Sequence, residues 1–287
     1  MWGLLCNPTS GGGRGGKIKV QVVSYLQSKG IAVVDLSGVD VQEATRNLNN
    51  AELKQLAGLI VVGGDGLVHL AIQRLASTKV PLLIIPAGTG NDFARTLGLN
   101  IERPIENLSL INEVEPAQVD LGQVGQRYFA QILSTGFDSL VNERANQIRF
   151  IKGRMKYNVA IIQVLSTFKP RNYHFRIDGV SFESQAMLIA VSNGKSYGGG
   201  MLISPMSDIQ DGYLDVMILG PVSRLDFLRV FPKVYSGSHI DHPAVKFLKG
   251  KNIEITAEAI AYADGERIGD LPIEVSIIEK SLMVYRQ

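Results

Sequence analysis

Residues 58–66 read Gly-Leu-Ile-Val-Val-Gly-Gly-Asp-Gly, and residues 80–92 read Val-Pro-Leu-Leu-Ile-Ile-Pro-Ala-Gly-Thr-Gly-Asn-Asp. Each stretch is a short apolar run that ends in glycines, which is typical of a strand buried in a parallel sheet. Apolar residues recur at helical spacing over 67–77. The two stretches therefore predict a strand, a helix and a second strand in succession, with glycine-rich loops after both strands.

The residues before this region repeat the same alternation. Residues 2–6 form an apolar run, a glycine-rich segment and a helical pattern follow, and residues 31–36 form another apolar run. Asp40 and Glu43 have the spacing of a capping box at the start of a helix. We therefore expect an α/β domain over residues 1–116, with a parallel sheet and helices on both faces.

The pattern changes near residue 117, where strands begin to dominate. We expect mainly antiparallel strands over residues 117–280, and the Asp178-Gly179 pair predicts a hairpin turn. The expected strands cover 118–124, 128–134, 173–177, 183–191, 213–219, 245–247, 252–257 and 273–278, with helices near 137–149, 154–168 and 223–235. Residues 281–287 are expected to return to the first domain.

Composition excludes several classes of protein. The 287 residues are 45% hydrophobic and carry a formal net charge of +2, which argues against nucleic-acid binding. The single cysteine, Cys6, allows no intrachain disulfide and favours a reducing compartment. No apolar run approaches the roughly 20 residues of a membrane span, so we expect a cytoplasmic protein that meets membranes transiently, at their surface.

The glycine-rich segment 11–16 fits two nucleotide-binding patterns incompletely. Gly11, Gly13 and Gly16 match the dinucleotide fingerprint, and Asp35 lies where a ribose-binding acid would follow. A nicotinamide-dependent oxidoreductase is therefore an alternative function. The same glycines approach a P-loop, but Ile18 stands where that motif needs a serine or threonine to bind magnesium.

Further motifs occur in a fixed order along the chain. They are Asn7-Pro8-Thr9-Ser10-Gly11, Gly63-Gly64-Asp65-Gly66, Gly88-Thr89-Gly90-Asn91-Asp92-Phe93-Ala94, Gly136-Phe137-Asp138, Ser192-Asn193-Gly194, Tyr197-Gly198-Gly199-Gly200, Asp211-Gly212-Tyr213-Leu214-Asp215 and Asp264-Gly265-Glu266. Together they resemble the diacylglycerol kinase catalytic family. The resemblance implies an α/β domain like those of NAD kinases and phosphofructokinases, followed by a β-sandwich. It also implies an ATP- and Mg²⁺-dependent lipid kinase that converts diacylglycerol, or a similar lipid alcohol, to phosphatidate.

The motifs of the first half indicate where ATP would bind. Glycine-rich loops at strand ends let backbone N–H groups approach phosphate oxygens. The candidate ATP-binding residues are Asn7, Ser10, Gly11, Ser37, Gly63, Gly64, Gly66, Leu67, Thr89 and Asn91. Asp65 is expected to act in catalysis by holding Mg²⁺, directly or through water. Asn91 and Asp92 are expected mainly to cap the next helix.

The motifs of the second half suggest a base and a second metal. Phosphoryl transfer to an alcohol needs a carboxylate near the hydroxyl proton. The resemblance assigns this part to Asp264 or Glu266, and the sequence does not separate them. It also implies a structural Mg²⁺ held by Asp208, Asp211 and Tyr213.

Two features concern partners and activity. The strip 144–156 is rich in arginine and lysine and could attract anionic lipid head groups, and a homodimer is a further expectation. Leu67, His69 and Leu70 stand where the family usually has threonine, asparagine and glutamate. A non-catalytic relative that binds nucleotide or lipid is therefore another alternative.

Overall fold

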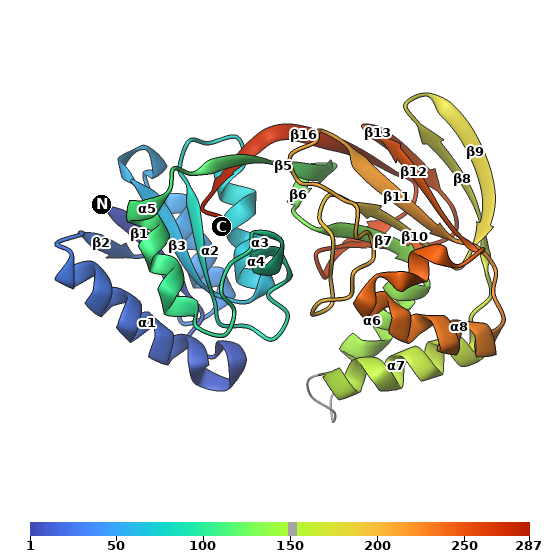
Figure 1. Ribbon diagram of the computed structural model, residues 1–287, viewed down its shortest axis with the longest axis horizontal. Coiled ribbons are helices and arrows are strands. Elements are labelled where there is room, and N and C mark those ends of the chain that lie inside the picture. The colour runs from blue at the N-terminus through green and yellow to red at the C-terminus, as the bar shows by residue number, and fades with distance from the viewer. Residues whose placement is uncertain (149–153) are drawn as a thin grey trace. The chain divides into compact units, whose positions relative to one another are not determined.

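The computed structural model describes residues 1–148 and 154–287, which divide into two compact units. The N-terminal unit contains Met1–Leu121, Gly198–Gly200 and Ile278–Gln287. The C-terminal unit contains Gly122–Tyr197 and Met201–Ile277. Figure 1 shows helices and strands in both units.

A parallel sheet of four strands is the centre of the N-terminal unit. Its order is β2 (Val33–Asp35), β1 (Trp2–Cys6), β3 (Gly58–Gly63) and β4 (Leu82–Pro86). Every residue of β1, β3 and β4 is buried, which explains the unbroken apolar runs in the sequence. Because the strands are parallel, the loops that follow them lie at one edge of the sheet.

Helices connect these strands and follow the last of them. They are α1 (Ser10–Ser28), α2 (Val41–Asn50), α3 (Asp65–Leu75), α4 (Asp92–Thr96) and α5 (Leu110–Glu113), with 3-10 turns at Leu53–Gln55 and Pro104–Ser109. The capping box predicted before α2 is confirmed, because the Asp40 carboxylate accepts a hydrogen bond from the Glu43 amide. The Glu43 side chain in turn accepts one from the Val39 amide.

The end of the chain completes this unit. Strand β16 covers Ile273–Val284, and its residue Val284 pairs in parallel with Leu82 of β4. Strand β5 (Ala117–Val124) pairs with β16, and the buried Asp120 accepts a hydrogen bond from the Lys280 amide at 2.7 Å. Residues far apart in the sequence thus close one edge of the unit.

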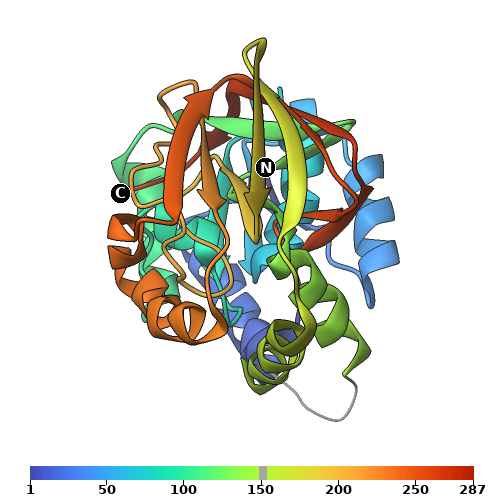
Figure 2. The same ribbon diagram turned by 90° about the vertical axis from the view of Figure 1, so that its right-hand side faces the viewer.

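The C-terminal unit is built mainly from antiparallel strands. One sheet has the order β12 (Val245–Gly250), β11 (Leu214–Leu219), β10 (Leu188–Ser192), β7 (Ile132–Gly136), β14 (Ile260–Ala263), β15 (Glu266–Asp270). The other contains β16, β13 (Asn252–Thr256), β8 (Arg171–Ile177) and β9 (Val180–Ala186), while the short strand β6 (Arg127–Phe129) pairs with β5. Figure 2 faces this unit and shows the helices gathered at one end of the strands.

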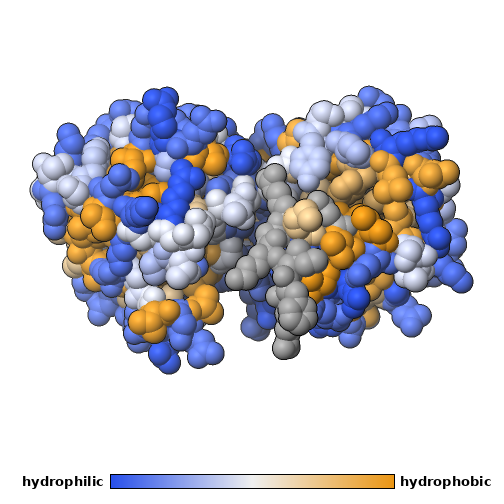
Figure 3. All heavy atoms as spheres, turned by 90° about the horizontal axis from the view of Figure 1, so that it is seen from below, coloured by the Kyte–Doolittle hydropathy of each residue, from blue (hydrophilic) through white to orange (hydrophobic). Residues whose placement is uncertain are grey.

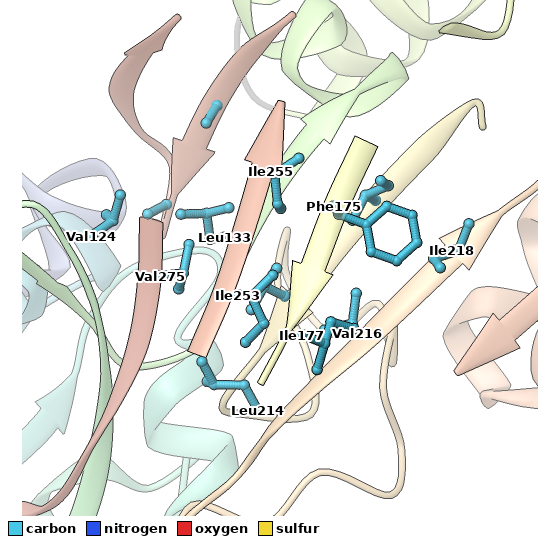
Figure 4. Packing of buried hydrophobic residues seen from close by; sticks show 14 of the residues in the cluster. Val124, Leu133, Phe175, Ile177, Leu214, Val216, Ile218, Ile253, Ile255 and Val275 are labelled. Atoms are coloured by element: carbon cyan, nitrogen blue, oxygen red, sulfur yellow. The ribbon is translucent and has the colours of Figure 1, made fainter. Parts of the chain in front are cut away.

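The core of the C-terminal unit lies between its two sheets. Phe175 and Ile253 come from one sheet, and Leu133 and Val216 from the other, yet all four belong to one buried cluster. Figure 4 shows these side chains pointing toward one another. Alternate residues of each strand supply the cluster, as expected when two sheets pack face to face.

Three helices of this unit form a second cluster. They are α6 (Phe137–Gln147), α7 (Arg154–Thr167) and α8 (Arg224–Val230), and 3-10 turns cover Phe231–Ser236 and Ser238–Asp241. Phe137, Ala160 and Phe227, one from each helix, pack together. In the described ranges, no helix is long and apolar enough to cross a membrane.

The predicted fold class is confirmed, with local differences. The hairpin at Asp178-Gly179 is present between β8 and β9, with positive φ at both turn residues. The sequence pattern does not predict strands β14 and β15, because both are short and the Asp264-Gly265 turn that joins them also fits a candidate active-site motif. Arg149 and Lys152 of the basic strip lie outside the described residues.

Cys6 should be chemically inert in the folded protein. Its side chain is 2% exposed, and burial raises the pKa of the thiol to about 11. At pH 8 the reactive thiolate is therefore about a thousandth of the population. We expect iodoacetamide to label Cys6 at pH 8 in denaturant but not in native buffer, as measured by intact mass. Rapid labelling of the native protein would contradict the burial of β1.

Candidate active site

Three loops meet at the carboxyl edge of the parallel sheet. A Cβ atom added to Gly88 would lie 2.5 Å from the Gly64 Cα, and one added to Gly11 would lie 2.3 Å from the Ala87 carbonyl oxygen. The loops after β1, β3 and β4 are therefore in backbone contact, and only glycine fits at these points. Strands β1 and β3 are neighbours although β2 separates them in sequence, which is the kind of switch point where open α/β sheets bind ligands.

Asp65 links two of these loops. Its Oδ2 accepts a hydrogen bond from the Asn91 amide at 2.8 Å, and its Oδ1 accepts one from the Asp92 amide at 2.7 Å. The carboxylate thus lies in the loop cluster where the sequence analysis placed it. These two hydrogen bonds come from backbone N–H groups, so Asp65 positions the loop after β4.

Asn91 and Asp92 do not cap α4 through their side chains, so the expected capping role is wrong. Asn91 lies at the N-cap position, but its side chain accepts a hydrogen bond from the Gly88 amide and donates one to the Gly88 carbonyl. The Asp92 carboxylate accepts hydrogen bonds from the Gly199 and Gly200 amides at 2.8 and 2.7 Å. Asn91 therefore closes its own loop by bonding to the Gly88 backbone, while Asp92 holds the Gly198–Gly200 segment.

The Gly198–Gly200 segment was missed as a partner of Asp92. All three glycines have positive φ, which side chains rarely tolerate, and this conformation turns two successive amides toward one carboxylate. The sequence did carry a signal, since three glycines after Tyr197 suggest an anion-binding turn. The sequence does not show that this anion is the Asp92 carboxylate, because Asp92 lies more than 100 residues earlier.

Several other predicted ATP-binding residues are occupied by local hydrogen bonds. The Asn7 Oδ1 accepts bonds from the Thr9 amide and hydroxyl, and the Ser37 hydroxyl oxygen accepts one from the Cys6 amide. Leu67 is buried, and a Cβ on Gly63 would touch its side chain at 2.8 Å. These three side chains shape the loops.

The remaining predicted residues are better suited to contact phosphate. Thr89 is exposed on the loop after β4, and the Ser10 hydroxyl lies close to Gly64. Gly66 lies in the first turn of α3, where backbone N–H groups have no partner within the helix. Gly11 and Gly12 have left-handed conformations, with φ of 58° and 70°, that few residues other than glycine adopt.

Asp35 is not arranged as a ribose-binding acid. Lys19 Nζ lies 2.5 Å from its Oδ2, and the Ser37 amide donates to its Oδ1. Burial alone would raise the pKa of Asp35, but the hydrogen bonds from Lys19 and Ser37 outweigh it and hold the pKa below its usual value. The carboxylate is thus paired within the chain, which removes the main support for the nicotinamide alternative.

The two acids of the Asp264-Gly265-Glu266 motif have different surroundings in the C-terminal unit. Asp264 and Gly265 form the two-residue turn between β14 and β15, both with positive φ. The Asp264 carboxylate accepts hydrogen bonds from the amides of Ala130, Gln131 and Ile132, at 2.7, 3.0 and 3.1 Å. Asp178 does the same in the other Asp-Gly hairpin, where it accepts bonds from Lys251 and Asn252.

Glu266 differs from Asp264 in every respect that matters for proton transfer. It begins β15, and its exposed side chain makes no hydrogen bond or ion pair with any residue that the structure describes. A carboxylate that is not engaged by backbone amides can accept a proton, while Asp264 would first lose its structural bonds. The geometry therefore favours Glu266 as the candidate base.

The predicted structural metal site has a different set of partners. Lys249 Nζ lies 2.6 Å from the Asp211 Oδ2, and the Asp211 Oδ1 accepts a hydrogen bond from the Tyr213 amide. Asp208 accepts a bond from the Gln210 amide. Within 1–148 and 154–287, no cluster of three or more histidine, cysteine or acidic residues could hold a metal ion. As arranged, these residues do not fit Mg²⁺, because a lysine ammonium already supplies the positive charge.

Lys249 should therefore replace a metal in stabilising this loop. The hydrogen bond to Asp211 raises the pKa of Lys249, and the buried Asp215 lies 3.9 Å away. We expect EDTA to leave the Tm of the native protein unchanged. Lys249→Met should lower Tm by about 2–4 °C, which corresponds to about 1 kcal/mol. A fall in the native Tm on adding EDTA would contradict this assignment.

Asp138 is a half-buried acid at the start of α6 that has no role in the sequence-based predictions. Its Oδ2 accepts a hydrogen bond from the Ser134 hydroxyl at 2.5 Å. Burial raises its pKa above the ordinary value, and hydrogen bonds from Ser134 and Tyr197 oppose the rise. The Gly-Phe-Asp motif at the start of α6 was the available signal for this residue.

The fold defines a class of protein, namely one that combines an α/β unit built on a parallel sheet with a mainly antiparallel β-sandwich unit. Comparisons with known proteins identify the family. Residues 1–124 match the model of the diacylglycerol kinase catalytic domain, and residues 131–286 match that of the YegS C-terminal NAD kinase beta sandwich-like domain.

Two curated relatives cover nearly the whole chain. A diacylglycerol kinase of Mycobacterium tuberculosis (strain CDC 1551 / Oshkosh) is 37% identical over 98% of this chain and 94% of its own length. One of Bacillus subtilis (strain 168) is 28% identical over 94% and 91%. The chain therefore belongs to the diacylglycerol kinase family and is a kinase.

A solved structure shares the fold. The crystal structure of a diacylglycerol kinase from Bacillus anthracis str. Sterne superimposes with a TM-score of 0.76, covering 100% of this chain and 96% of its own. The sequences are 22% identical, so this likeness concerns the fold alone.

Proposed function

We propose that this kinase transfers the γ-phosphoryl group of ATP to the free hydroxyl of diacylglycerol and produces phosphatidate. The observation that carries the proposal is the backbone contact of three glycine loops at one sheet edge, with Gly64 and Gly88 packed Cα against Cα. The curated relatives named diacylglycerol kinase support the choice of acceptor.

The loops supply the groups that a triphosphate needs. The N-terminus of α3 offers N–H groups and a favourable dipole, and Ser10 and Thr89 add hydroxyl donors. Mg²⁺ bound to the ATP phosphates would neutralise part of their charge. Asp65 contributes by holding the amides of Asn91 and Asp92, which keeps the loop after β4 against the loop after β3.

Glu266 is the base in this proposal. The acceptor oxygen bonds to the γ-phosphorus, the bond from that phosphorus to the β–γ bridging oxygen breaks, and ADP leaves. The proton of the lipid hydroxyl passes to the Glu266 carboxylate. Asp264 holds the turn that carries Glu266, through its three backbone hydrogen bonds.

A direct assay tests the proposal. The protein is incubated with ATP labelled at the γ-phosphate, MgCl₂ and mixed micelles of diacylglycerol, and the lipids are separated. We expect labelled phosphatidate that depends on both ATP and Mg²⁺. Parallel micelles of sphingosine and ceramide test the choice of lipid alcohol. Label on one of these lipids but not on diacylglycerol would overturn the proposed acceptor.

A binding experiment covers the two alternative functions. ATP binding is measured by calorimetry, with NADH as competitor. Binding of NADH that ATP does not displace would favour the oxidoreductase. Binding of ATP without any phosphorylated lipid would favour the non-catalytic alternative.

A further inference from the structure

Helices α7 and α8 present large apolar side chains to solvent. Met155 and Ile162 of α7 are 63% and 66% exposed, and Leu225 and Leu228 of α8 are 68% and 50% exposed. Six of the fourteen large hydrophobic residues exposed among the described residues lie in α7 or in 224–236. Single exposed leucines are ordinary, but such a concentration marks an interaction surface.

The inner faces of the two helices are already occupied. Ala160 and Leu165 of α7 and Phe227 of α8 belong to one buried cluster with Phe137. Helix α7 therefore carries large apolar side chains on its outer side as well as its inner side, whereas the outer face of a surface helix is ordinarily polar. Figure 3 views the molecule from below, where α7 lies in Figure 1, and shows hydrophobic residues gathered on that side of the C-terminal unit.

The charge around these apolar residues is mostly positive. Residues 154–171 contain four basic residues and no acidic one, and residues 222–236 contain three basic residues and one acidic one. The single acid, Asp226, lies 3.3 Å from His242. Exposed Lys169, Arg224 and Arg229 form no ion pair with any residue in the described parts of the chain. Apolar residues flanked by such cations suit an anionic, apolar partner.

We propose that the outer face of α7 and α8 docks on the surface of a bilayer that contains anionic phospholipid. Met155, Ile162, Leu225 and Leu228 enter the boundary between head groups and acyl chains, and the flanking arginines and lysines contact lipid phosphates. The proposal rests on the proposed function, because diacylglycerol resides in such a bilayer. It adds the surface by which this kinase reaches its substrate.

Vesicle binding without ATP tests the surface alone. Sedimentation is measured with vesicles of phosphatidylcholine containing about a third phosphatidylglycerol, and with pure phosphatidylcholine. The double variant Ile162→Gln, Leu225→Gln removes apolar area without changing charge, and we expect its partitioning to fall at least tenfold. Arg224→Gln with Arg229→Gln should weaken binding about tenfold on the anionic vesicles only. Added salt should weaken binding of the native protein.

Val180→Gln is the matched control. Val180 is 59% exposed in the same unit, at the β8–β9 hairpin, so its substitution removes a comparable apolar group elsewhere. It should bind vesicles like the native protein. The proposal is overturned if native protein does not sediment with anionic vesicles, or if the Ile162 and Leu225 double variant sediments equally well.

Two further measurements distinguish membrane docking from self-association and from a defect in catalysis. Light scattering gives the oligomeric state, and a native dimer that the double variant dissociates would make this face a contact between copies, against the proposal. A water-soluble short-chain diacylglycerol reports the chemistry without a bilayer. Native protein and double variant should phosphorylate it equally. If neither protein phosphorylates the short-chain diacylglycerol while vesicle binding behaves as expected, the proposed function is wrong and the proposed docking surface is still supported.

Discussion

Glu266→Gln is expected to lower kcat for diacylglycerol phosphorylation by about 10²- to 10⁴-fold and to leave Tm unchanged. The Glu266 side chain is exposed and makes no bond with any described residue, so replacing its carboxylate with an amide should not change the stability of the protein. The amide cannot accept the hydroxyl proton, which accounts for the loss of rate. The measurement is initial velocity with saturating ATP in mixed micelles, together with a thermal melt. Glu258→Gln, at another carboxylate of the same unit, should retain full activity.

Asp264→Asn should mainly lower stability and affect the rate of phosphorylation less. Asparagine tolerates the positive φ of 48° at this position, so the substitution isolates the lost charge. The side-chain NH₂ group of the asparagine cannot accept a hydrogen bond, so at least one of the three backbone N–H groups would lose its acceptor. We expect the free energy of unfolding to fall by about 2–3 kcal/mol, with a moderate loss of activity from a less ordered turn. An unchanged Tm in Asp264→Asn, or full activity in Glu266→Gln, would reverse our assignment of the two acids.

Gly88→Ala is expected to weaken ATP binding at least a hundredfold. The added Cβ would lie 2.5 Å from the Gly64 Cα, and backbone at such a distance cannot rotate away. The loops after β3 and β4 would have to separate, and the amide donors that they present would lose their common geometry. Calorimetric titration with MgATP should show at least a hundredfold weaker Kd, because several charge-assisted hydrogen bonds are lost together.

Gly220→Ala controls for the general effect of adding a methyl group. Its Cβ would meet the Ala244 carbonyl oxygen at 3.4 Å, an ordinary contact. This variant should bind ATP like the native protein and melt at nearly the same temperature. Normal ATP affinity in Gly88→Ala would show that the two loops need not touch to bind nucleotide, and the proposed phosphate site would then be wrong.

The identity of the loops could be predicted from sequence, but the partners of their side chains could not. Unbroken apolar runs at 58–62 and 80–85 predict buried parallel strands, because both faces of such strands are covered. Parallel strands then bring their following loops to one edge. Whether Asp65 faces a cation or the Asn91 and Asp92 amides depends on the loop conformation, for which the sequence has no periodic signal.

The same division holds for the C-terminal unit. Asp-Gly pairs at 178 and 264 both have the chemistry of a tight turn, and only the first was interpreted as a hairpin. A two-residue turn joins strands through local backbone geometry, so it is readable from sequence. The three amides that donate hydrogen bonds to Asp264 belong to residues more than 130 positions earlier. The difference between the structural Asp264 and the exposed Glu266 therefore depends on the same distant residues.

The alternation of strands and helices, the fold class and the glycine-rich loops can all be predicted from the amino-acid sequence, because they follow from burial periodicity and backbone sterics within a few residues. Three features become visible in the folded chain alone: which acids are structural, where Lys249 lies relative to Asp211, and that α7 exposes large apolar side chains to solvent. Charge pairing and exposure depend on neighbours that folding brings from distant parts of the chain, and no local pattern records those neighbours.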